Sequence, residues 1–205
     1  QRLRLGLCAM IREGSAWRDV ADVIKCVTEQ RLDSRHVVLV TDDRHADTLI
    51  THGHMDDVIR RAIEEGVDPV TAMQMATLNT AEHFNVSRDI GSVAPSKCAD
   101  ITIIENLSKI RVETVIVDGV VVAHEGKMTI RLASPRYPRF VKSSVNMKRS
   151  VSPEDFVIKA PVGDGEICVH VIGIIEGKAV TDHLQENVPV KNGEIQVDME
   201  NDIAK

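Results

Sequence analysis

The sequence predicts an α/β fold in its first part, followed by a small β-domain and part of a further α+β domain. Residues 37–40 are four consecutive apolar residues, which is typical of a parallel strand buried on both faces. A strand and an amphipathic helix precede them, so a parallel strand–helix–strand unit is expected. From Gly91 onward, β-branched runs follow one another without helices between them.

The chain should begin with a strand and a helix. Residues 3–11 are expected to form the strand, and a turn follows in which Ser15 is the candidate helix N-cap. A helix over residues 17–29 is predicted because its apolar residues recur at helical spacing. These positions are Val20, Val23, Ile24 and Val27.

The second strand ends at Asp42, and two further helices are expected after it. One covers residues 55–65 and ends at Gly66. The other starts at Asp68 and Pro69, with aspartate as N-cap and proline at the first helical position.

The remaining strands lack intervening helices. Runs at 99–105 and 112–123, the second containing an Asp118-Gly119 turn, predict a small β-sandwich or barrel. Strands are also expected at 167–175 and 194–197. The chain therefore divides into residues 1–88, 89–133 and 134–205.

Composition excludes several classes of protein. The 205 residues carry a net charge of −6 and 2% aromatic residues, which argues against a nucleic-acid surface. No apolar run approaches the length of a membrane span, about 20 residues. The four cysteines are widely spaced and form no CxxC pair. We expect a soluble cytoplasmic protein without nucleic-acid or membrane partners.

Two adjacent acids at the tip of the second strand are the first candidate site. Asp42 and Asp43 follow the buried run directly, where α/β barrels place their chemistry. They could ligate a metal or move a proton. Alternatively, one of them only caps the next helix.

Other polar residues lie close to the same edge. Arg44 and His45 are near enough to reach a ligand at Asp42, and Glu13 follows the preceding strand. His52 and His54 form a His-x-His pair, which could hold a divalent metal or simply belong to a loop.

Several motifs together resemble a known family. Residues 91–100, GSVAPSKCAD, with VIVDG at 115–119, resemble the amidohydrolase signature, although Ser96 stands where that signature usually has glycine. Within this superfamily the sequence is most similar to the adenine deaminases of bacteria and archaea. The segments that carry this similarity are MIREGSA at 10–16, TDDRHAD at 41–47, GHMD at 53–56 and SPEDF at 152–156.

The resemblance implies the C-terminal part of a TIM-like (β/α)8 barrel, a composite β-domain and part of a C-terminal domain. It also implies a metal-dependent hydrolase that converts adenine to hypoxanthine and ammonia in purine salvage. A divalent metal activates the attacking water in such enzymes. Mn²⁺ or Fe²⁺ is favoured, and Zn²⁺ remains possible. The resemblance also implies a homo-oligomer.

The resemblance gives the candidate residues roles. Asp42 becomes the metal ligand and proton shuttle, and Asp43 either takes that role instead or orients the residues around it. Glu13, Arg44, His45 and His54 contact the substrate or support the metal ligands. No metal role passes to His52 or His54, because the family's His-x-His pair ends the first barrel strand.

The family's other metal ligands are expected before residue 1, so this chain alone should be inactive. Its open strand edges should also leave the first region more loosely folded than the β-domain. Two alternatives remain: another amidohydrolase acting on cyclic amides, and a truncated binding or assembly module without catalysis.

Overall fold

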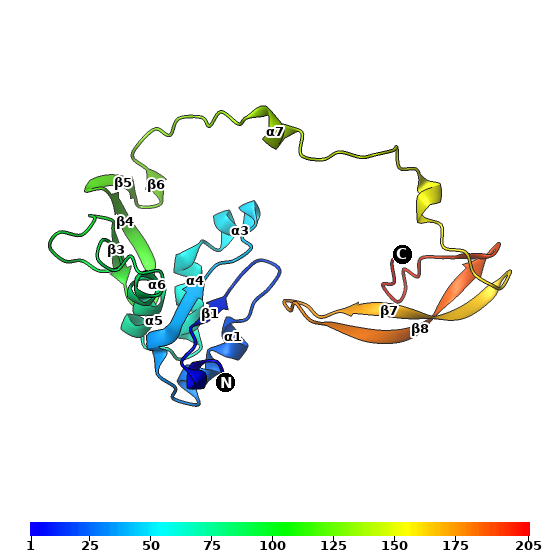
Figure 1. Ribbon diagram of the computed structural model, residues 1–205, viewed down its shortest axis with the longest axis horizontal. Helices are drawn as coiled ribbons and strands as arrows, with labels where there is room; N and C mark the ends of the chain where they lie inside the picture. The colour runs from blue at the N-terminus through cyan, green and yellow to red at the C-terminus, as the bar shows by residue number, and fades with distance from the viewer. The chain divides into compact units, whose positions relative to one another are not determined.

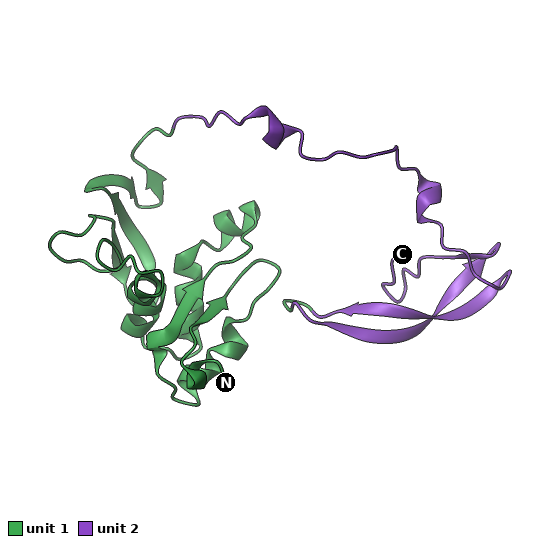
Figure 2. Cartoon of the chain, viewed as in Figure 1, with its two compact units in different colours: residues 1–132, 176–178 green, residues 133–175, 179–205 purple.

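The computed structural model describes residues 1–205 and divides into two compact units (Figure 2). Unit 1 contains residues 1–132 and 176–178, and unit 2 contains residues 133–175 and 179–205. None of the helices is long and apolar enough to cross a membrane.

The first strand of unit 1 is shorter than the sequence predicts. Leu3–Leu5 is a 3-10 helix that ends at Gly6, whose φ is 75°. Strand β1 then covers only Ala9–Arg12. The expected strand over residues 3–11 is therefore wrong over residues 3–8, because a 3-10 helix and the left-handed backbone at Gly6 precede β1.

The predicted helix at 17–29 starts later and is split in two. Helix α1 covers Val20–Val23 and α2 covers Lys25–Thr28, with Ile24 between them. The expected N-cap, Ser15, is wrong, because Asp19 occupies that position.

The parallel strand–helix–strand unit is confirmed. Strand β2 covers Val37–Val40 after a 3-10 helix at Ser34–His36, and it pairs in parallel with β1. Ala9 faces Val37 at one end of the register, and Arg12 faces Val40 at the other. The carboxyl ends of both strands therefore lie at one edge, as Figure 1 shows.

Four helices follow β2. Two agree with the predictions: α4 at Met55–Glu64 and α5 at Pro69–Ala76, where the Asp68 side chain accepts a hydrogen bond from the Thr71 amide. Helix α3 at Ala46–Thr51 was not expected. Helix α6 at Leu78–His83 continues α5 after a break at Thr77.

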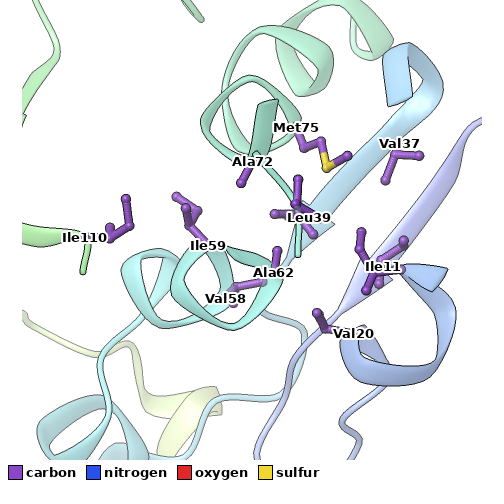
Figure 3. Close-up of a cluster of buried hydrophobic side chains, with 12 residues drawn as sticks. Ile11, Val20, Val37, Leu39, Val58, Ile59, Ala62, Ala72, Met75 and Ile110 are labelled. Carbon is purple, nitrogen blue, oxygen red and sulfur yellow. The ribbon is translucent and has the colours of Figure 1, made fainter. Parts of the chain in front are cut away.

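One apolar core lies between the strands and these helices (Figure 3). Ile11 of β1 and Leu39 of β2 meet Val58 of α4 and Met75 of α5 there. Ile110 joins this cluster from the following β-region. The core thus fixes the two strands, and with them the loops at their carboxyl ends.

The β-region of unit 1 is a single antiparallel sheet in the order β3-β4-β5-β6. The strands are Ile101–Asn106, Arg111–Val117, Val120–His124 and Lys127–Met128. The predicted hairpin is confirmed, since Asp118 and Gly119 join β4 to β5 with φ angles of 50° and 76°. A sandwich needs two facing sheets, and this stretch supplies one.

Unit 2 is built on a long hairpin. Strand β7 at Gly165–Ile174 pairs with β8 at Thr181–Lys191, and β9 at Glu194–Ile195 extends the sheet. Short helices at Arg139–Lys142 (α7) and Pro153–Phe156 precede it. Strands β7 and β9 were expected. Strand β8 was missed because most of its residues are polar and exposed.

Candidate functional site

The candidate site lies where the loops after β1 and β2 meet. The amide of Glu13 donates to the carbonyl of Val40 at 3.0 Å, which extends the strand pairing by one residue. The Ser15 amide then donates to the Asp43 carbonyl at 2.6 Å. The two loops are therefore joined through their backbones.

Asp42 sits at the tip of β2 in a left-handed backbone conformation, with φ of 56°. Its carboxylate accepts a hydrogen bond from Arg12 Nη1 at 2.8 Å, and Asp19 accepts one from Arg12 Nε at 2.7 Å. The guanidinium also lies 4.5 Å from the centre of the Trp17 ring. These bonds, first to Asp19 and then to Asp42, raise the pKa of Arg12 and keep it charged.

Asp43 turns toward the loop after β1. Its Oδ2 accepts a hydrogen bond from the Ala16 amide at 2.8 Å, which is the main cause that lowers its pKa. Its Oδ1 is buried and has no hydrogen-bond partner. This atom lies against Gly14, where an added Cβ would overlap it. The carboxylate is therefore held in place by the opposite loop.

Ser15 ties a third segment to this pair of loops. Its Oγ accepts a hydrogen bond from the His45 amide at 2.9 Å and donates one to Thr48 Oγ1 at 2.8 Å. Ser15 thus fixes the start of α3, although it does not cap the helix that the sequence indicates.

Arg44 is a buried cation, with a side chain only 5% exposed. Its Nη2 donates to Asp57 of α4 at 2.7 Å, while its Nε is buried without a partner. An unpaired buried donor costs free energy unless a ligand or water accepts from it.

Glu13 and Arg44 line a common pocket of about 390 Å³. Glu13 is 9% exposed, and burial raises its pKa against the smaller opposing effects of the Val20 amide and the nearby arginines. The Val20 amide donates to its Oε2 at 3.2 Å. The lining residues also include Arg18, Thr48, His52, Asp57, Arg61 and Glu64.

Asp42 lines a different pocket, of about 550 Å³, together with Arg12 and Asp19. The structure therefore separates the candidate residues into two groups. His45 and His54 line neither pocket; His54 precedes α4, and its amide donates to Asp56 at 2.8 Å. His52, to which the family resemblance gives no metal role, lines the Glu13 pocket.

Sequence reasoning missed three residues that shape this region. Gly14 gives Asp43 room, Ser15 links the loops, and Asp57 neutralises Arg44. These contacts join residues far apart in the chain, so no local sequence pattern predicts them. The one available signal is Gly14 itself, because a glycine directly after Glu13 allows another side chain to approach the backbone closely.

A catalytic divalent metal does not fit the residues around Asp42 taken alone. The structure contains no group of three or more His, Cys, Asp or Glu side chains that could hold a metal ion. The Asp42 carboxylate is already paired with Arg12. A catalytic metal normally has at least three protein ligands.

Comparisons with known proteins agree on one family. Residues 11–122 match the amidohydrolase family. Over 204 residues the chain is 46% identical to the adenine deaminase of Moorella thermoacetica and 45% identical to that of Mesorhizobium japonicum. Each alignment covers 100% of this chain and 34% of the relative, so the chain spans about a third of their length.

A solved structure, of an amidohydrolase from Thermotoga maritima MSB8, is also similar. The alignment covers 60% of this chain and 39% of that one, with 18% identity and a TM-score of 0.37.

Proposed function

Because the chain belongs to the amidohydrolase family, we propose that it forms part of an adenine deaminase, which hydrolyses adenine to hypoxanthine and ammonia. One observation carries this proposal. The family match ends at residue 122, whereas the identity to adenine deaminases extends over 204 residues and includes unit 2. An amidohydrolase with another substrate would not explain the similarity beyond residue 122.

The proposed arrangement assigns each region a place in such an enzyme. Residues 1–88 would supply the last strands and helices of a TIM-like barrel, since β1 and β2 are parallel and are followed by helices. Residues 89–133 would form the composite β-domain, and residues 134–205 a connector and the start of the C-terminal domain.

Asp42 is the proposed catalytic carboxylate. It stands at the carboxyl end of a barrel-type strand, where it could carry the proton of the attacking water to the leaving amine. Asp43 would hold it in position, because Ala16 and Ser15 fix the side chain and the backbone of Asp43. Glu13, Arg44, His45 and His54 would contact the substrate or support the site.

Members of this family generally depend on a divalent metal. Asp42 would be one ligand of this metal, and Mn²⁺ or Fe²⁺ is favoured over Zn²⁺. The described residues contain no group of three or more potential ligands, so the other ligands would have to come from outside this chain. Adenine is the proposed substrate, and a homo-oligomer is the proposed assembly.

Replacing the matching third of the Moorella thermoacetica enzyme with this chain tests the proposal. We expect the chimaera to release ammonia from adenine, and Asp42→Asn within it to lower kcat at least about 100-fold, the scale of one lost acid–base group. The 205-residue chain alone should show no turnover with added Mn²⁺.

A chimaera that melts like the parent enzyme but leaves adenine intact would overturn the proposal. Turnover of dihydropyrimidines instead would favour another cyclic-amide hydrolase. A stable complex with another chain, without turnover of either substrate, would favour a binding module.

A further inference from the structure

Two histidines of unit 2 meet across the β7–β8 ribbon. Nε2 of His183 lies 2.7 Å from Nδ1 of His170, and the ring centres are 4.8 Å apart with planes inclined by 33°. In the ladder His170 faces Gln185 and His183 faces Ile172, so the two histidines are diagonal neighbours on one face. Both are exposed, so burial does not require their nitrogens to pair.

From this convergence we propose that His170 and His183 form a two-histidine site for a borderline divalent cation, with Cu²⁺ preferred over Ni²⁺ and Zn²⁺. Two imidazole nitrogens bound to one metal at about 2.0–2.1 Å are about 2.9–3.4 Å apart, depending on the angle at the metal. The rings need to separate by only a few tenths of an ångström from their present distance.

The proton balance allows this exchange. In the neutral pair one ring donates the hydrogen that lies between Nε2 of His183 and Nδ1 of His170. If His183 is the donor, moving its proton from Nε2 to Nδ1 of the same ring leaves Nε2 of His183 and Nδ1 of His170 each with a lone pair. A metal then replaces the hydrogen bond without any net loss of protons.

The donor set argues against a harder cation. Along β8, side chains alternate between the two faces, so the neighbouring Asp182 lies on the face opposite His183. Glu186 lies on that opposite face as well. Ca²⁺ and Mg²⁺ prefer several oxygen ligands. Neutral imidazoles suit copper, nickel and zinc.

This site does not depend on the proposed deaminase activity, so metal binding to the full chain tests it directly. Cu²⁺ is titrated at pH 7.5, by calorimetry and by the broadening of amide signals in NMR spectra. We expect His170→Asn and His183→Asn each to weaken binding about tenfold or more, because each removes one arm of a chelate. His124→Asn is the matched control, since His124 lies on strand β5 and pairs with Thr114 rather than with another histidine.

Equal affinity in the wild type and both ribbon variants would overturn the site, as would broadening centred on His52 and His54. A second readout does not need a variant. In the wild type, Cu²⁺ should slow amide exchange in β7 and β8 at pH 7.5, because a metal bound to His170 and His183 would hold the two strands together. Unchanged exchange would contradict a metal that bridges the two strands.

Discussion

At the scale of single residues, the contact between Gly14 and Asp43 decides how the two loops fit together. The carboxylate occupies the space that a side chain at position 14 would need, and it accepts the Ala16 amide there. No sequence pattern reveals this contact, because the two residues are brought together by the pairing of β1 with β2. The sequence does locate both acids at the strand end, since that depends only on the apolar run before them.

Gly14→Ala should therefore destabilise unit 1. The new Cβ would overlap Asp43 Oδ1 and lie 3.1 Å from the Trp17 carbonyl, so we expect a loss of about 1–3 kcal/mol, as for an overpacked core. Thermal unfolding measures it. Gly163→Ala is the control, because a Cβ there meets nothing within 4 Å, and it should change stability by less than about 0.5 kcal/mol. If Asp43→Ala does not reduce the cost of Gly14→Ala, the overlap is not its cause.

The stability of unit 1 should depend on pH through the buried carboxyl group of Glu13. Burial raises its pKa above the ordinary 4.5, so the folded state binds this proton more tightly than the unfolded state does. The stabilisation that comes from protonated Glu13 is fully present below the pKa of Glu13 in the unfolded chain. It is lost as the pH rises through the higher pKa of Glu13 in the folded protein. Glu13→Gln cannot ionise, so it should match the wild type in acid and be more stable than it at neutral pH.

Chemical denaturation of the wild type and Glu13→Gln between pH 4 and pH 8 measures this difference. Glu113→Gln, at an exposed position of β4, controls for the removal of one negative charge. A wild type that is more stable than Glu13→Gln at pH 7 would show that the arginines around the pocket outweigh the burial of the carboxylate.

At the scale of elements, the sequence predicts best where the signal is local. The apolar run of β2 and the Asp68-Pro69 start of α5 were both found, because burial and capping act within a few residues. Helix α3 was missed, since six residues held by Ser15 carry little periodicity of their own. Strand β8 was missed because pairing with β7, and not an apolar pattern, defines it.

The turn before β3 contains a serine in a backbone conformation that favours glycine. Ser96 has a φ of 69°, a left-handed conformation that favours glycine, the residue usual at this place in the family signature that the sequence resembles. Ser96→Gly should stabilise unit 1 by up to about 1 kcal/mol, because it relieves the strain at Cβ. Ser108→Gly, at a loop position without positive φ, should be neutral or destabilising in the same thermal assay. Destabilisation by Ser96→Gly would show that the backbone entropy of glycine dominates.

At the scale of the whole molecule, burial is distributed unevenly. Val37, Val38 and Leu39 of β2 are no more than 2% exposed, and the core cluster lies entirely within unit 1. In the β7–β8 ribbon only Val188 and Val190 are buried. From its open strand edges, the sequence predicts that residues 1–88 are more loosely folded than the β-domain at 89–133. The core cluster comes almost entirely from residues 1–88, which argues that this region is the more stable of the two.

Hydrogen exchange on the full chain without metal should reveal this order. Amides of residues 37–40 should exchange most slowly, because opening them requires disruption of the core, and those of residues 115–117 should exchange faster. Amides of β7 and β8 should exchange fastest, since this hairpin has few buried side chains and β9 pairs with β8 at only two residues. Protection of residues 167–171 equal to that of residues 37–40 would mean that unit 2 is stabilised by more than its own side chains. The folding of the two units would then have to be treated as coupled.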